Sequence, residues 1–299
     1  MSDRIVDERF VEFPCGDDRL AAILHAPAQP RSVGVVVIVG GFQYRVGSHR
    51  QFVLLARDLA RAGIPVLRFD CRGMGDSTGH FRGFEYIEDD IRAAVDAFFA
   101  HQPGLDGVVL WGLCNAAASN MYYATKDPRV RGLVLINPWV RTEQGIARAY
   151  LRYYYLKRML QCELWQRLFR GELNLRATIA SFVSTVANAF RRKPAGPARP
   201  EAGADLVAWG ELGLPDEALH DRMHDGLRQF RGKVLFQISG ADLTGREFDD
   251  LWKGSRAWRR LMKRDNVTIR YLQEADHTYT TRRDLDQATE MTREFVSRL

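Results

Sequence analysis

Short apolar runs alternate with amphipathic segments along the first 140 residues. Four runs of aliphatic and β-branched residues have the length of strands, at 33–39, 65–70, 108–111 and 132–136. Such continuous runs are typical of strands that are covered on both faces. Residues 51–62 and 86–102 repeat apolar positions every three to four residues, which predicts helices, and 9–26 reads as two strands joined by a turn. This order predicts an α/β fold with a mostly parallel, doubly wound sheet.

The alternation stops near residue 141 and resumes near residue 231. Further strands are predicted at 233–239 and 267–272, followed by a helix at 281–299. The intervening section reads as helical, and we expect it to be a cap inserted across the mouth of the sheet. The predicted organisation is a core in two parts with an insertion, over residues 1–140, 141–230 and 231–299.

Positive charge is concentrated in the predicted cap. Residues 141–200 contain twelve Lys and Arg but only three Glu, a local net charge of +9 against +6 for the whole chain. Such a patch would attract an acidic partner or an anionic surface. The alternative is an ordinary solvated helix face, which is the commoner reason for a run of charge.

The strand at 108–111 leads into a turn with the pattern of a nucleophile elbow. The G-x-S-x-G pattern occurs with cysteine in place of serine and alanine in place of the last glycine, as Gly112-Leu113-Cys114-Asn115-Ala116. Such a turn would present Cys114 at the amino end of a helix, where free N–H groups favour a thiolate and an oxyanion. The alternative is a buried cysteine that only packs as a small hydrophobe.

A nucleophilic cysteine needs a base, and the base needs an orienting acid. His277 follows the last predicted strand and Asp242 follows the strand before it, which is the chain order nucleophile, acid, histidine. We therefore predict His277 as the general base and Asp242 as its partner, although Asp242 also suits a helix N-cap. The fallback acids are Asp249 and Asp250, whereas Asp276 is too close to His277 in sequence.

The oxyanion hole in this scheme uses two backbone N–H groups. One belongs to the residue after the nucleophile, Asn115, and the other comes from the first glycine-rich loop, at Phe42 with Gln43 as its neighbour. No phosphate-binding glycine motif occurs, and the four cysteines lie far apart without a C-x-x-C pair. No metal, cofactor or disulfide framework is therefore predicted, and a reducing cytoplasm is the expected location.

With these elements in order, the chain resembles the α/β-hydrolase superfamily over nearly its whole length. Gly73-Met74-Gly75-Asp76-Ser77 is similar to that superfamily's G-x-G-x-S loop. More narrowly, the chain resembles the exosortase A system-associated hydrolase 1 family in Gly40-Gly41-Phe42-Gln43-Tyr44-Arg45-x-Gly47-Ser48-His49-Arg50-Gln51, Trp111-Gly112-Leu113-Cys114-Asn115-Ala116 and Ser239-Gly240-x-Asp242-Leu243-Thr244. This narrower resemblance implies a bacterial protein linked to exopolysaccharide and protein-sorting loci.

Three functions are weighed on these residues. The first is an acyl hydrolase of the esterase or thioesterase type, acting through a thioester on Cys114 with a small or carrier-bound acyl substrate. The second is an acyltransferase, because a thioester acyl-enzyme is open to attack by amines and thiols. The third is a non-catalytic scaffold that docks a partner through its basic cap. No nucleic-acid motif is recognised, and neither a transmembrane run nor a signal peptide is predicted.

Overall fold

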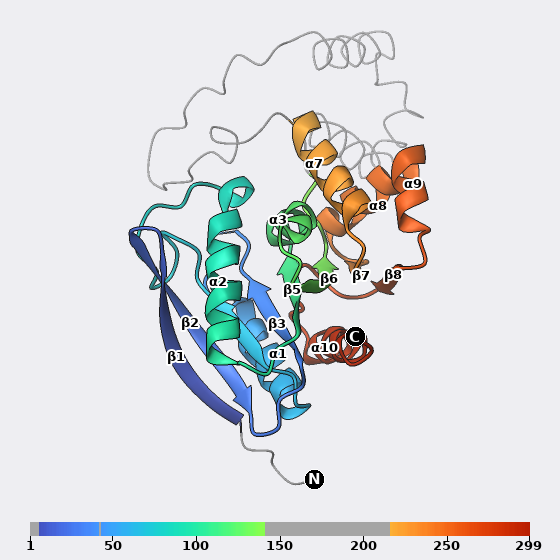
Figure 1. The fold of residues 1–299 in the computed structure, drawn as a ribbon. Coiled ribbons are helices and arrows are strands. Elements are labelled where there is room, and N and C mark those ends of the chain that lie inside the picture. Colours follow the sequence, from blue (N-terminus) through green and yellow to red (C-terminus); the bar gives the residue numbers. More distant parts are fainter. Residues whose placement is uncertain (1–5, 42, 141–215) are drawn as a thin grey trace, which may run out of the picture. The chain divides into compact units, whose positions relative to one another are not determined.

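The structure is a computed structural model that describes residues 6–41, 43–140 and 216–299. Strands in these residues form one eight-stranded sheet in the order β1-β2-β4-β3-β5-β6-β7-β8 (Figure 1). β2 pairs antiparallel with β1 and β4, and all other neighbours are parallel. The predicted mostly parallel sheet is confirmed. The strands are β1 (Val6–Cys15), β2 (Asp18–Pro27), β3 (Val33–Ile38), β4 (Val66–Phe69), β5 (Gly107–Leu113), β6 (Val130–Ile136), β7 (Lys233–Ser239) and β8 (Val267–Leu272).

Helices cover both faces of the sheet. Val35 and Val37 of β3 pack in one apolar cluster with α1 and α10, whereas Val36 and Ile38 belong to the cluster formed with α2, α3, α7, α8 and α9. All four side chains are fully buried, which explains why the strand is apolar at every position. The helices are α1 (Gln51–Arg61), α2 (Glu88–His101), α3 (Asn115–Tyr123), α7 (Asp216–Gln229), α8 (Leu243–Gly254), α9 (Arg256–Met262) and α10 (Arg282–Val296).

The predicted cap is only partly within the described residues. Its last part forms α7, which packs on α3 so closely that a Cβ added at Gly226 would lie 2.3 Å from the carbonyl oxygen of Met121. Residues 6–140 and 216–299 belong to one compact unit. Residues 141–215 of the predicted cap lie outside the described residues, and the domain division stays a prediction.

The loops at the carboxyl edge of the parallel strands contain the unusual backbone conformations. Positive φ angles at non-glycine residues in the described part of the chain occur in the loops after β3, β5, β6 and β8, at His49, Arg50, Cys114, Asn137 and Tyr279. Such conformations cost free energy and concentrate at functional sites. In a doubly wound sheet this edge is also where ligands bind. Of the helices in the described ranges, none is long and apolar enough to cross a membrane.

Candidate active site

Cys114 lies at a sharp turn between β5 and α3. Its backbone has φ 63° and ψ −123°, and the strand ends at the residue before it while the helix begins at the residue after it. The turn is fixed to the neighbouring strand, because the Cys114 N–H donates to the carbonyl of Ile136 at 2.9 Å and the Cys114 carbonyl accepts from Trp139 N–H at 3.1 Å. The Cys114 side chain is half-buried. This is the strand, strained turn and helix expected of a nucleophile elbow.

Small residues around Cys114 are required by the close approach of β5 and α3. A Cβ added at Gly112 would lie 2.6 Å from Asn120 Nδ2 and 2.8 Å from the carbonyl carbon of Ala116. Real Cβ atoms do not tolerate contacts to backbone at such distances, so position 112 needs glycine. Ala116 is fully buried in the same contact.

His277 and Asp242 form a close pair across two loops. His277 Nδ1 lies 2.8 Å from Asp242 Oδ2, and 7% of the Asp242 side chain is exposed against 34% of the His277 side chain. Asp242 also accepts from the N–H groups of Thr244 and Gly245 at 3.1 Å, as the N-cap of α8. The Asp242 carboxylate is therefore both the N-cap of α8 and the hydrogen-bonding partner of His277, which are the two interpretations that the sequence allowed. Its backbone bonds fix the oxygen that faces the histidine.

Two other aspartates near the predicted acid, Asp249 and Asp276, form hydrogen bonds with other groups. Asp249 accepts from Trp252 Nε1 at 2.8 Å and from Tyr271 OH at 2.7 Å. Asp276 accepts from the N–H groups of Thr278 at 3.1 Å and Thr280 at 3.0 Å, within its own loop. Asp276 thus shapes the turn that carries His277, while Asp242 is the carboxylate bonded to the ring.

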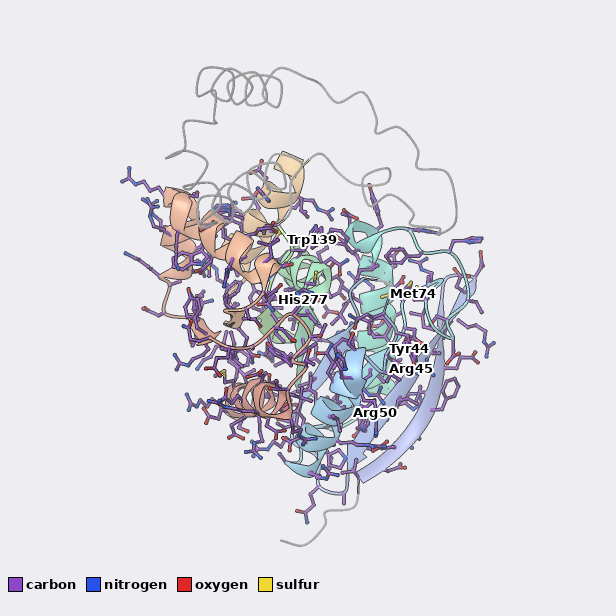
Figure 2. All side chains as sticks on the ribbon, turned by 180° about the vertical axis from the view of Figure 1, so that it is seen from behind. Tyr44, Arg45, Arg50, Met74, Trp139 and His277 are labelled. Atoms are coloured by element: carbon purple, nitrogen blue, oxygen red, sulfur yellow. The ribbon has the colours of Figure 1, made fainter. Side chains whose placement is uncertain are left out.

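The His277 ring contacts Cys114 as well as Asp242, and the two contacts change its acidity. Burial of the ring lowers the pKa of His277, but hydrogen bonds and charge interactions with Asp242 and Cys114 outweigh that effect and raise the pKa to about 10. The ring is therefore protonated at neutral pH. Figure 2 labels His277 together with Tyr44, Met74 and Trp139, which come from the loops after β3, β4 and β6.

One of the two predicted oxyanion donors is described. Asn115 is the first residue of α3, so its N–H is among those without a partner inside the helix. Its side chain accepts from Gly41 N–H at 2.8 Å. Because Gly41 N–H is used in this bond, that group is not free to bind an oxyanion. The other predicted donor, Phe42, lies outside the described residues and stays a prediction.

Asn137 is a contributor that the sequence reasoning missed. It has φ 43°, and its side chain donates to Ser239 Oγ at 2.9 Å and accepts from Ser239 N–H at 2.8 Å. This pair fixes the end of β7, three residues before Asp242. Asparagine after a predicted strand was the available signal, because it is one of the few residues that tolerate positive φ. The partner, 102 residues away in sequence, could not be identified from it.

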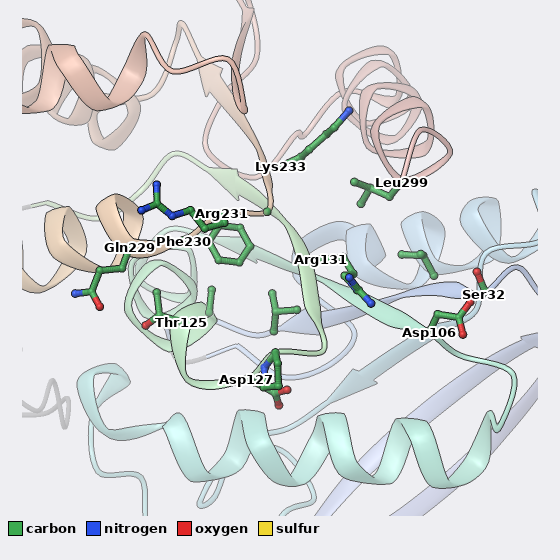
Figure 3. Close-up of a pocket in the computed structure, with 15 residues that line it drawn as sticks. Ser32, Asp106, Thr125, Asp127, Arg131, Gln229, Phe230, Arg231, Lys233 and Leu299 are labelled. Atoms are coloured by element: carbon green, nitrogen blue, oxygen red, sulfur yellow. The ribbon is translucent and has the colours of Figure 1, made fainter.

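A large hollow lies at the amino edge of the sheet, opposite the edge that carries Cys114. It has a volume of about 840 Å³ and lies at the amino ends of β3, β5, β6 and β7 (Figure 3). Its charged lining residues include both signs: Arg131, Arg231, Lys233, Asp106 and Asp127. It takes no part in the site at Cys114, which is at the carboxyl edge.

No cluster of three or more potential metal-ligating side chains occurs within the described ranges.

Solved structures of esterases and related hydrolases share this fold. The Pyrococcus furiosus esterase Pf2001 is 14% identical, covers 98% of this chain and 91% of its own, and superposes with a TM-score of 0.64. Est1E from Butyrivibrio proteoclasticus, solved with ferulic acid bound, is 18% identical with coverages of 96% and 98% and a TM-score of 0.59. The dienelactone hydrolase from Anabaena variabilis is 13% identical with coverages of 98% and 98% and a TM-score of 0.59. These matches confirm the predicted α/β-hydrolase fold.

The protein is a hydrolase of the α/β-hydrolase class. This follows from the order of strands in the sheet, the turn at Cys114, and the matches to solved structures and to a family model. The chain belongs to the Hydrolase_4 family, described as serine aminopeptidase, S33, whose model matches residues 30–186. The family's description refers to serine, whereas this chain has Cys114 at the elbow. No curated protein matches the chain.

Proposed function

We propose that the chain is an acyl hydrolase of the esterase or thioesterase type, with Cys114 as nucleophile, His277 as proton carrier and Asp242 as its orienting acid. The observation that carries this proposal is the 2.8 Å contact between His277 Nδ1 and Asp242 Oδ2 in a ring that also contacts Cys114. Three residues from loops after three different strands meet there. A structural cysteine would need no such pair.

The raised pKa of His277 favours an ion-pair mechanism. A protonated ring beside a cysteine stabilises the thiolate, which is the attacking form. In this proposal the Cys114 thiolate attacks the acyl carbon, and the resulting oxyanion is stabilised by backbone N–H groups of Asn115 and Phe42. The oxyanion then collapses, the bond to the leaving thiolate or alkoxide breaks, and His277 gives its proton to that group.

Water completes the cycle. The neutral His277 ring accepts a proton from water, which attacks the thioester carbon on Cys114. The carboxylic acid leaves as the C–S bond breaks, and the thiolate and protonated ring are restored. His277 thus acts first as an acid and then as a base.

Transfer to another acceptor is the second candidate, and the presence of cysteine at the elbow favours it. A thioester acyl-enzyme is more open to amines and thiols than an oxygen ester would be. If the resemblance to the exosortase-associated family extends to function, the acyl donor would be carried by an acidic carrier protein that the basic residues 141–200 attract. A non-catalytic scaffold is the remaining alternative.

Steady-state assays with a panel of acyl thioesters and activated esters test the proposal. We expect thiol release by the wild type, and about a thousandfold lower kcat/KM in Cys114→Ala and His277→Ala. Cys15→Ala is the matched control, because Cys15 is buried beside Asp90, away from the elbow. Product analysis with and without an added amine or thiol separates hydrolysis from transfer. No turnover of any substrate would favour the scaffold instead.

A further inference from the structure

We propose that Asn115 and Asp70 are positioning residues that fix the loop after β3, residues 40–47, for the reaction at Cys114. They act at opposite ends of this β3 loop, one at Gly41 and one at Arg45. The inference rests on the proposed function, because it assumes that the β3 loop supplies an oxyanion donor. Both side chains act through the loop, and neither side chain is assigned a contact with the substrate.

At the first end, the side chain of Asn115 fixes the glycine pair. Asn115 Oδ1 accepts from Gly41 N–H at 2.8 Å, and the side chain is almost fully buried. The contact is tight, since a Cβ added at Gly40 would lie 2.2 Å from the same oxygen and 2.7 Å from the carbonyl of Leu113. Asn115 therefore has two separable parts. Its N–H is a predicted oxyanion donor, and its side chain sets the position of the loop that faces this donor.

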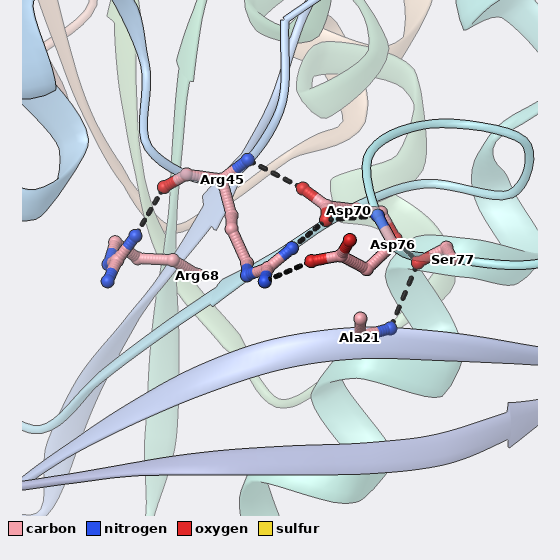
Figure 4. Close-up of polar contacts among 6 residues, drawn as sticks. All are labelled: Ala21, Arg45, Arg68, Asp70, Asp76 and Ser77. Carbon is pink, nitrogen blue, oxygen red and sulfur yellow. Dashed lines mark hydrogen bonds and ion pairs between the residues drawn. The ribbon is translucent and has the colours of Figure 1, made fainter.

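At the second end, Asp70 binds Arg45 through both its backbone and its side chain. Asp70 Oδ1 accepts from Arg45 N–H at 2.6 Å, and Asp70 Oδ2 pairs with the Arg45 guanidinium (Figure 4). The guanidinium also pairs with Asp76, and the Arg45 carbonyl accepts from Arg68 Nη1. The backbone of Arg45 is thus bonded on both its N–H and its carbonyl.

The G-x-G-x-S loop is shaped around the Asp70 carboxylate. Asp70 is fully buried, and a buried carboxylate is stable only when it is paired and hydrogen-bonded. Asp76 N–H donates to Asp70 Oδ2 at 3.1 Å, and Ser77 Oγ donates to the Asp70 carbonyl at 2.7 Å. A Cβ at Gly75 would lie 2.2 Å from Asp70 Oδ2, so only glycine leaves room for the carboxylate. This motif thereby presents a fixed negative charge to the β3 loop.

We infer that Asn115 and Asp70 position the loop, and do not only stabilise the fold, because of where their bonds to Gly41 and Arg45 lie. An oxyanion donor must be placed to within a few tenths of an ångström, and a misplacement of about 1 Å can cost about a hundredfold in rate. Asn115 begins α3 and Asp70 follows β4, and they bind the β3 loop at Gly41 and Arg45, one on each side of position 42 in the sequence. A loop fixed at one end only would be free to pivot there.

The test compares two variants with matched controls at the other edge of the sheet. Asn115→Ala removes the bond to Gly41 but keeps the Asn115 N–H, and Asp70→Asn removes the charge that faces Arg45. Asn266→Ala is the control for the first, because Asn266 Nδ2 donates to the Gly232 carbonyl at 2.7 Å. Asp127→Asn is the control for the second, because buried Asp127 likewise binds the N–H and guanidinium of one arginine, Arg129.

We expect kcat on an acyl thioester to fall about 10- to 100-fold in Asn115→Ala and Asp70→Asn, with KM within about twofold of the wild type. The two controls are expected to change Tm but to leave kcat within about twofold. Wild-type kcat in folded Asn115→Ala would overturn the inference, as would an equal loss of kcat in the controls. If Asp70→Asn does not fold, Asn115→Ala still decides the matter.

The failure of this inference and that of the proposed function give different results. A wild type that forms no acyl adduct on Cys114 contradicts the proposed function and with it this inference. A wild type that is acylated, with Asn115→Ala acylated as fast at an unchanged Tm, contradicts the inference alone.

Discussion

Cys114 has a backbone conformation that residues with a Cβ rarely adopt. A residue in a sparsely populated region costs about 1 to 3 kcal/mol, and the surrounding structure must impose it. Here β5 and α3 are both fixed in the core, so the single residue between them absorbs the sharp change in direction. The strain follows from placing the thiol at the carboxyl edge.

This strain predicts an unusual order of stability among variants. Cys114→Gly and Cys114→Ala both remove the thiol, but only glycine relieves the positive φ. We expect Cys114→Gly to be more stable than Cys114→Ala by about 1 kcal/mol, although glycine normally costs about that much in conformational entropy. Urea unfolding measured by circular dichroism would test this. A more stable alanine variant would contradict the presence of strain at Cys114.

The pH profile tests the state of the His277 ring. Because its pKa is raised to about 10, the protonated form, which is the acid of the proposed mechanism, is present at neutral pH and is lost as the pH rises through about 10. We expect kcat/KM to hold up to about pH 9, to reach half its plateau near pH 10 and to fall about tenfold per unit above that. In Asp242→Asn the fall should begin at lower pH, because a carboxylate that raises the pKa is removed. An alkaline limit near pH 6.5 in the wild type would contradict this picture.

At the scale of single residues, the sequence predicts the candidate catalytic residues better than the residues that hold them in position. Chain order singled out Cys114, His277 and Asp242, and the structure brings the three together, although their roles stay proposals. The bonds of Asn115 to Gly41 and of Asn137 to Ser239 join loops that are 74 and 102 residues apart. Such bonds depend on how two turns meet in space, and no local sequence pattern predicts that arrangement.

Among the elements, the strands were the most predictable. The run at 108–111 lies inside β5, which extends over Gly107–Leu113, and the run at 65–70 contains β4. An apolar run marks where a strand is covered, whereas hydrogen bonding to neighbours decides where it ends, so the centres agree and the ends shift. The amphipathic helix predicted at 86–102 is α2, Glu88–His101, for the same reason.

The assignment of α7 was harder, because an amphipathic helix does not reveal which surface it covers. It lies within the range predicted for the cap, yet it packs on α3 through Gly226. The glycine allows the two backbones to approach, and only the structure shows which backbone is approached. Its apolar residues Leu219, Met223 and Leu227 are buried in the same cluster as α3.

A pair of glycine variants tests the packing of α7. Gly226→Ala would place a methyl group 2.3 Å from the Met121 carbonyl, so we expect a loss of about 1 to 3 kcal/mol. Gly254→Ala, at the end of α8, meets nothing within 4 Å and should be neutral or stabilising by up to about 1 kcal/mol. Thermal or urea unfolding of both variants provides the comparison. Equal effects would argue against close packing of α7 on α3.

On the scale of the whole molecule, charge separates one segment from the rest. Residues 141–200 carry a net charge of +9, so the remainder of the chain sums to −3. A sequence shows such an imbalance directly, but it does not show which partner the charge attracts. The presence of a partner is therefore a proposal that rests on electrostatics alone.

Salt dependence tests that proposal. If residues 141–200 attract an acidic acyl carrier protein, raising the salt from about 50 to about 300 mM should raise KM for a carrier-bound acyl group about tenfold. Hydrolysis of the same acyl group on a small neutral thiol should change less than about twofold, because no charged surface is recognised there. Equal salt dependence of the two substrates would contradict electrostatic recruitment.

The central claim is that Cys114 carries the acyl group, and peptide mapping by mass spectrometry after acid quenching tests it most directly. Burial raises the pKa of Cys15 to about 11 and that of Cys71 well above 9, so neither competes as a nucleophile. Incubation with the panel of acyl thioesters should give one acyl group, on the peptide that contains Cys114. The adduct should be absent in Cys114→Ala and unchanged in Cys15→Ala. An unmodified Cys114 with every thioester, or equal acylation of Cys114→Ala, would contradict the account.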